Sequence, residues 1–263
     1  MDRRELLAGL GASVLMGADP MNAQGESKRA PTYLELKVWR LHNTPENQGA
    51  RLAAYLEDGL TPALARTDAK LVGTFSTVIG PDSPSYISVT QFPSLAAMEA
   101  TIAKLKSDEE HHRALEKLGE GPGLPFVRVE SSLLRSFDVL PEPAILDTAG
   151  RAGRIFELRT YESQSFLTLA RKVGMFNNAE AQIFERLGFR PVFFGETIVG
   201  PRQPNLMYML SYDNLTARDR LWGEFGSSPE WKKLSGQPEL KDAEIVANIT
   251  NVILAPLPFS AVR

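Results

Sequence analysis

The second half of the chain repeats the residue pattern of the first half at a fixed spacing. Gly80-Pro81 and Leu95 recur as Gly200-Pro201 and Leu215, each 120 positions further along. The other pairs at this offset are Pro84 with Pro204, Leu105 with Phe225, Ser107 with Ser227, and Glu110 with Glu230. The first strand matches at an offset of 122, so the second copy is two residues shorter in its first helical region. A constant offset across several elements indicates an internal duplication.

Hydrophobic periodicity predicts the order strand-helix-strand-strand-helix-strand in each copy. The strands are expected at 33–39, 71–79, 86–92 and 127–137, and again at 155–161, 192–199, 206–212 and 245–254. Between the first two strands lie helical stretches at 47–58 and 166–187, the latter with a predicted break near Gly174. This order is that of the split βαβ unit, so we expect an α+β fold with two tandem ferredoxin-like βαββαβ domains. We place the domains at 32–140 and 154–263, joined by a linker rich in Pro, Gly and Ala at 141–153.

A stretch from Tyr212 to Leu234 predicts a strand end followed by two helices. Asn214 is a favourable N-cap, and Arg218 and Trp222 then share one stripe of the first helix. Ser228-Pro229 starts the second helix, which carries Trp231. We expect both tryptophans to pack in the core, and Arg218 to pair with a carboxylate of its own domain.

Composition excludes several classes of function. The 263 residues carry a net charge of −3 without a basic cluster, which argues against nucleic acid as a partner. The absence of cysteine excludes disulfides, thiolate metal sites and a cysteine nucleophile, and three histidines make a multi-histidine metal centre improbable. We therefore predict no metal and no cofactor.

The first 31 residues have the pattern of an export signal and leader. Arg3-Arg4 precedes Leu6-Leu7 and a short apolar run, which resembles a twin-arginine signal of a bacterial protein. The run is too short for a stable membrane span. We expect a periplasmic or secreted protein, and the alternative is an amphipathic N-terminus without a targeting role.

The second half resembles the NIPSNAP family, which is part of the dimeric α/β-barrel superfamily. The resemblance covers about 154–254 and rests on Glu157-Leu-Arg-Thr-Tyr161, Gly200-Pro-Arg, Tyr208, Tyr212-Asp, Arg218 and Ser227-Ser-Pro-Glu-Trp231. The first half matches less closely, with Glu35-Leu-Lys for Glu-Leu-Arg, Trp39 for the tyrosine, and His111 for the tryptophan. The resemblance implies two sheets that pair face to face into a barrel, here within one chain. A further pairing of chains into a homo-oligomer stays open.

Strand alternation suggests one row of candidate ligand-binding residues in each half. If Phe156 and Leu158 face the helices, then Glu157, Arg159 and Tyr161 face the barrel interior. The other candidates are Glu35, Lys37 and Trp39 in the first half, and Glu196 and Tyr208 on the next strands of the second half. Such a row would either bind an anionic or carbonyl-bearing molecule between aromatic walls or form a structural network of ion pairs.

Some two-domain members of the superfamily bind haem through a histidine, and others are cofactor-free monooxygenases. His111 aligns with Trp231, so we expect a packing position rather than a haem ligand. We predict an exported protein that binds a small, partly apolar molecule in its barrel. The alternatives are a cofactor-independent monooxygenase or isomerase that uses the Glu/Arg/Tyr row, with catalytic residues unknown, and a protein-interaction module.

Overall fold

The computed structural model describes residues 30–44, 46, 48–145 and 154–263. Eight antiparallel strands in these residues close into one barrel, in the order β1-β3-β2-β8-β5-β7-β6-β4. Within each repeat the strands keep the same relative order, β4-β1-β3-β2 and then β8-β5-β7-β6. The predicted α+β fold with two ferredoxin-like halves is therefore confirmed.

The first repeat alternates strands and helices as the sequence predicts. Its strands are β1 (Tyr33–Arg40), β2 (Lys70–Ile79), β3 (Ser85–Phe92) and β4 (Arg128–Ser136). Its helices are α1 (Gln48–Ala54), the π-helix η1 (Tyr55–Leu60), α2 (Thr61–Ala65), α3 (Leu95–Ser107) and α4 (Glu109–Gly119).

The second repeat has the same elements and two further short helices before its last strand. Its strands are β5 (Ile155–Glu162), β6 (Arg190–Val199), β7 (Asn205–Tyr212) and β8 (Asn248–Pro256). The helices are α5 (Phe166–Met175), the π-helix η2 (Phe176–Glu180), α6 (Ala181–Leu187), α7 (Leu215–Ser227), α8 (Pro229–Ser235), the 3₁₀-helix η3 (Pro238–Leu240) and α9 (Asp242–Ile245).

The break predicted near Gly174 is wrong. Gly174 lies inside α5, and the chain continues through η2 into α6 without leaving the helical conformation. Both repeats widen the helix by a π turn at the corresponding place, η1 and η2. A π turn accommodates an extra residue in a helix, so it disturbs the 3.6-residue period on which the prediction depended.

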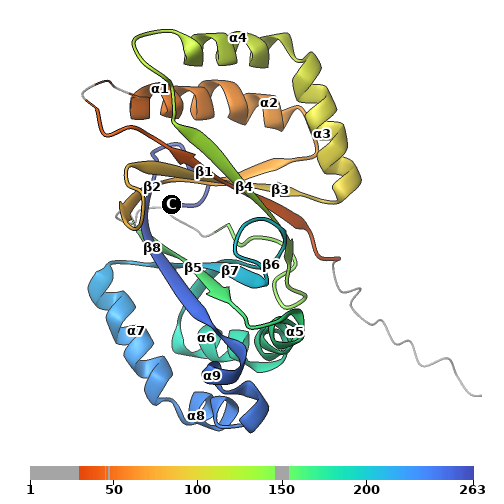
Figure 1. Ribbon diagram of the computed structural model, residues 1–263, viewed down its shortest axis with the longest axis vertical. Coiled ribbons are helices and arrows are strands. Elements are labelled where there is room, and N and C mark those ends of the chain that lie inside the picture. Colours follow the sequence, from red (N-terminus) through yellow and green to blue (C-terminus); the bar gives the residue numbers. More distant parts are fainter. Residues whose placement is uncertain (1–29, 45, 47, 146–153) are drawn as a thin grey trace, which may run out of the picture.

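The two repeats join edge to edge, and helices cover the outer side of each half. Strand β2 pairs with β8, and β4 pairs with β6, so each repeat supplies the partners for the open edges of the other. Figure 1 shows α1 to α4 on one side of the barrel and α5 to α9 on the other. None of the helices in the described residues is long and apolar enough to cross a membrane.

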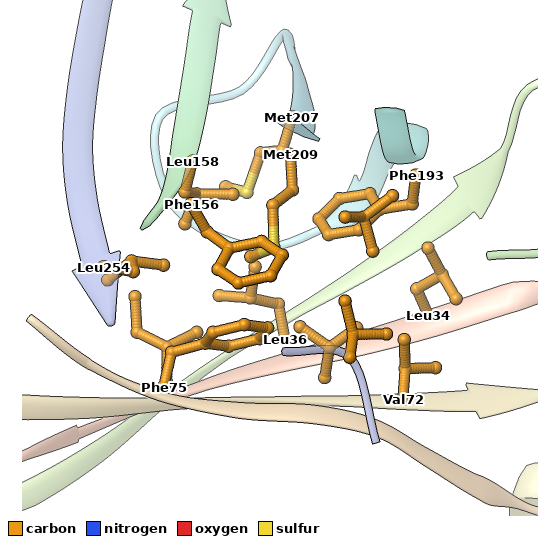
Figure 2. Packing of buried hydrophobic residues seen from close by; sticks show 14 of the residues in the cluster. Leu34, Leu36, Val72, Phe75, Phe156, Leu158, Phe193, Met207, Met209 and Leu254 are labelled. Atoms are coloured by element: carbon orange, nitrogen blue, oxygen red, sulfur yellow. The ribbon is translucent and has the colours of Figure 1, made fainter. Parts of the chain in front are cut away.

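Apolar side chains from both repeats fill the barrel interior (Figure 2). The rings of Phe75 and Phe156 lie 4.9 Å apart at the contact between the repeats. Leu158 and Leu36 point into the same interior cluster. The prediction that Phe156 and Leu158 face the helices is therefore wrong, because the enclosed barrel interior requires the apolar face of each strand.

The segment that follows β8 returns to the barrel and adds one more apolar residue to it. Leu257 donates its backbone N–H to the carbonyl of Thr74, and the hydroxyl of Ser260 accepts the N–H of Thr74 at 3.0 Å. These bonds hold Val262, which is fully buried, within the interior cluster. The barrel interior is therefore a packed core to which strands and the C-terminal segment both contribute.

A shared interior predicts that the two repeats unfold together. We expect Phe156→Ala to lower the free energy of unfolding by about 3–5 kcal/mol, since it leaves a cavity between the sheets. Urea denaturation followed by circular dichroism should still give one transition. Phe166→Ala is the matched control, because Phe166 is 69% exposed and its loss should cost less than about 0.5 kcal/mol. Two separate transitions in the Phe156→Ala variant would contradict a common core.

Candidate functional site

A buried carboxylate is the centre of the polar residues in the second repeat. Glu157, on β5, is fully buried and accepts hydrogen bonds from four side chains. Arg159 donates from Nη1 at 2.8 Å, and Arg218 donates from Nε and Nη2 at 3.1 and 2.7 Å. Trp222 Nε1 and the Tyr212 hydroxyl each donate at 3.1 Å. We call these five residues the Glu157 cluster.

The cluster lies between the sheet and the helices. The prediction that Glu157, Arg159 and Tyr161 face the barrel interior is therefore wrong. Apolar and polar residues alternate along β5, so the side that faces away from the interior carries the polar row. Asn214 caps α7 by accepting the N–H of Ala217. The four-residue spacing of Arg218 and Trp222 then places both on the helix face above β5.

The two arginines keep the Glu157 carboxylate ionised in spite of its burial. Burial alone would raise the pKa of Glu157, but the hydrogen bond from Arg218 and the charges of Arg159 and Arg218 outweigh it and lower the pKa. Burial also raises the pKa of Tyr212, and the neighbouring carboxylate raises it further. The phenol therefore remains a hydrogen-bond donor to Glu157.

Aromatic rings surround the guanidinium of Arg159. Its carbon lies 4.3 Å from the ring centre of Trp222, 5.4 Å from that of Tyr161 and 5.9 Å from that of Tyr208. Nη2 donates to the Tyr161 hydroxyl at 3.1 Å, and the Tyr208 hydroxyl donates to the same oxygen at 2.7 Å. Burial raises the pKa values of both tyrosines, so both keep their protons. The Nε atom of Arg159 is buried without a hydrogen-bond partner in the described residues.

A second buried ion pair adjoins these rings, and the sequence prediction missed it. Lys172 on α5 donates to Glu180 at 3.0 Å and lies 3.5 Å from a carboxylate oxygen of Asp242. Its ammonium is 5.6 Å from the ring centre of Tyr161 and 5.3 Å from that of Trp231. The π turn between Lys172 and Glu180 changes the helical period, so the sequence spacing of the two residues does not show that they share one face of the helix.

The first repeat has a simpler arrangement at the corresponding positions. Lys37 and Glu35 form an ion pair of 3.1 Å, and Ser131 donates to Glu35 at 2.9 Å. Trp39 donates from Nε1 to Ser88 at 3.0 Å and packs among the helices of its own repeat. The barrel core separates the two rows, so the structure does not bring them together.

The other residues singled out from the sequence lie in three different places. Tyr208 reaches the cluster through Tyr161. Glu196 lies on β6 opposite Arg135 of β4, and the described residues give it no hydrogen bond to the Glu157 cluster. His111 is buried in α4, with Nε2 at 3.0 Å from the hydroxyl of Tyr55 and Nδ1 at 3.2 Å from the carbonyl of Leu105. Both of its ring nitrogens are therefore engaged.

The side chains of the Glu157 cluster bond to one another and leave no group free for acid–base chemistry. Five N–H and O–H groups reach one carboxylate, which leaves no free oxygen to accept a proton from a substrate. Burial raises the pKa values of the adjoining Tyr161 and Tyr208, so both hydroxyls keep their protons and neither supplies a base. The arrangement is a network of ion pairs that fastens α7 to the sheet.

An open groove lies instead on the outside of the first repeat, between α1–η1 and α4. Its volume is about 470 Å³. The lining residues are Ala50, Arg51, Ala54, Tyr55, Asp58, Gly59, Arg113, Ala114, Lys117 and Leu118. We call it the α1–α4 groove; sequence periodicity alone could not indicate it, because it depends on the distance between two helices.

The same region of the second repeat is covered by additional helices. Among the groove residues, Ala114 has the larger Leu234 as its counterpart 120 positions later. The helices η3 and α9 lie against α5 there. Divergence after the duplication thus left a groove in one repeat and a covered helix in the other.

The barrel interior has little room for a ligand. One end of the barrel contains a cavity of about 70 Å³, bordered by residues of both repeats that include Thr160, Thr250 and Ser132. A water molecule needs roughly 10–15 Å³ of such space, so this cavity has room for a few water-sized molecules.

A sequence model of the NIPSNAP family matches the chain twice, over residues 35–139 and 156–261. A comparison with curated protein sequences finds no match. Among solved structures, a candidate monooxygenase from Lactobacillus acidophilus is similar with a TM-score of 0.56 at 11% identity, over 86% of this chain and 94% of that chain. An anthrone oxidase-like protein is similar with a TM-score of 0.51 at 14% identity, over 90% and 95% of the two chains. At these identities the similarity establishes the fold.

The Glu157 cluster predicts a pH-dependent contribution to stability. We expect Glu157→Gln to lower the free energy of unfolding by about 3 kcal/mol at pH 7, because it leaves the charges of Arg159 and Arg218 uncompensated. The folded-state pKa of Glu157 is lowered, so its contribution is complete above the ordinary glutamate pKa of about 4.3 and is lost as the pH falls through the lower folded value.

Denaturation in urea at pH 7 and at about pH 3, below the unfolded-state pKa of about 4.3, would measure this contribution. The difference between wild type and Glu157→Gln should shrink at the lower pH. Glu196→Gln is the matched control on β6 of the same sheet and should change stability little at either pH. An equal loss for Glu157→Gln at both pH values would contradict the role of the carboxylate charge.

Proposed function

The chain belongs to the NIPSNAP family, and on this premise we propose that it binds a small, partly apolar molecule in the α1–α4 groove. Its two family domains are copies of one unit, so each repeat serves as a reference for the other. The observation that carries the proposal is that the first repeat has an open groove where, in the second repeat, extra helices lie against α5.

The size and composition of the groove suit such a ligand. Sites for small molecules commonly have about 300–1,000 Å³ and are mostly apolar with a few polar groups. The α1–α4 groove has about 470 Å³, and its residues include alanines, a leucine and a tyrosine as well as charged side chains. The barrel interior, by comparison, is filled by side chains of both repeats.

The oxygenase or isomerase alternative is supported less well. It assigns acid–base chemistry to the Glu157, Arg159 and Tyr161 row, where the carboxylate accepts five hydrogen bonds and its pKa is lowered. A general base needs a free oxygen within reach of the substrate proton and a pKa near the working pH. The monooxygenase and anthrone oxidase descriptions belong to structural neighbours, whose similarity concerns the fold.

Filling the groove should abolish ligand binding and preserve the fold. A screen of metabolites by thermal melting should yield compounds that raise the Tm by about 5–10 °C at a hundred times their Kd. We expect Ala54→Leu to remove this shift, because the added side chain occupies the groove, and to leave the Tm without ligand within about 2 °C.

Ala96→Leu provides the matched control for this experiment. Ala96 is exposed on α3 and does not line the groove, so the variant should retain the full shift. A ligand whose shift survives in Ala54→Leu binds elsewhere and would refute the location. A screen in which no compound raises the Tm would count against small-molecule binding as a whole.

We also propose that the chain is exported through its N-terminal signal. Residues 1–29 lie outside the described part of the chain, so the support is the sequence Arg3-Arg4 followed by Leu6-Leu7. Fusion of residues 1–31 to a reporter that is active only in the periplasm should give a signal in a bacterial host. Replacement of Arg3 and Arg4 by lysine should abolish it, and a cytoplasmic wild-type fusion would refute the proposal.

A further inference from the structure

We infer that the ligand of the α1–α4 groove is an organic anion, with an apolar body and one carboxylate or sulfonate group. This inference rests on the proposed function, since it concerns the same groove. It depends on two features, an apolar floor that lacks free polar groups and an excess of cations at the rim.

The floor of the groove consists of small and apolar groups. A Cβ atom on Gly59 would lie 2.6 Å from the Cβ of Ala114, so the two helices approach closely at this point. Ala54 and Leu118 extend the apolar surface on either side. Tyr55 contributes its ring, because its hydroxyl is bonded to His111 at 3.0 Å. A ligand therefore meets carbon at the floor and requires an apolar body.

The rim carries three cations and one anion, in a chain whose net charge is −3. The guanidinium of Arg51 is already hydrogen-bonded within the protein, since it donates to the backbone carbonyls of Glu120 and Gly123. Asp58 supplies the single negative charge among the lining residues. This leaves Arg113 and Lys117 as the cations available to a ligand.

Arg113 and Lys117 are four residues apart on α4, so their side chains lie on the same face of the helix. Arg113 is 65% exposed and has a weak contact with Glu109 at 3.8 Å. Lys117 has no ion pair within the described residues. Two cations at one edge of an apolar groove match a molecule that has its single negative charge at one end.

The experiment compares two fluorescent probes that share an apolar body. 8-Anilinonaphthalene-1-sulfonate carries a sulfonate, and N-phenyl-1-naphthylamine is its neutral counterpart. We expect the sulfonate probe to bind the full-length protein at least tenfold more tightly than the neutral probe. The double variant Arg113→Gln/Lys117→Gln should weaken the sulfonate probe about tenfold and leave the neutral probe unchanged.

Two further variants complete the design. Lys232→Gln/Lys233→Gln removes two exposed cations from α8 of the second repeat and serves as the control for net charge. It should leave the Kd of both probes within twofold of wild type. Ala54→Leu should weaken both probes, because it fills the groove that holds their common body.

The outcomes separate the inference from the proposed function. Equal affinities for the two probes, both weakened by Ala54→Leu, would overturn the anion preference and retain the groove. Equal effects of the two charge-removing double variants would also overturn it, because the attraction would then be general. Binding of both probes that is insensitive to Ala54→Leu would refute the groove itself.

Discussion

Closure of the barrel between the two repeats determines where the other side chains lie. Because β2 pairs with β8 and β4 with β6, the inner faces of both sheets are removed from solvent in a single enclosed space. Such a space accepts apolar residues only, unless polar groups are fully paired within it. Phe75, Phe156 and Leu158 therefore face inward, and the polar residues of each strand are left for the helical side.

The two repeats differ in the side chains that their helices place over the polar face of the sheet. In the second repeat, Arg218 and Trp222 reach down from α7 to Glu157, whereas Met98 and Ile102 stand 120 positions earlier in the first. The polar contacts at the barrel end diverge as well. Arg40 pairs with Asp82 at 3.7 Å, and the corresponding Glu162 and Arg202, 3.9 Å apart, have exchanged their charges. Duplication preserved the geometry, and the chemistry of each copy changed within it.

The sequence predicted the duplication, the order of the elements and the family, and these agree with the structure. The row Glu157, Arg159 and Tyr161 was also identified, as was the pairing of Arg218 with a carboxylate of its own domain. The orientation of the row was predicted wrongly. Alternation states that neighbouring residues face opposite ways, but it does not say which face meets the second sheet.

The sequence by itself determined the repeat, the ferredoxin-like topology and the residues available for a polar cluster, because each of these depends on local order and spacing. Only the tertiary structure decided that the hydrogen bonds to the Glu157 carboxylate all come from within the cluster and that a groove opens between α1–η1 and α4 of the first repeat. Both properties depend on distances between elements far apart in the chain. The space between α1 and α4, and the reach of Arg218 to Glu157, exist only once the helices have packed on the sheet.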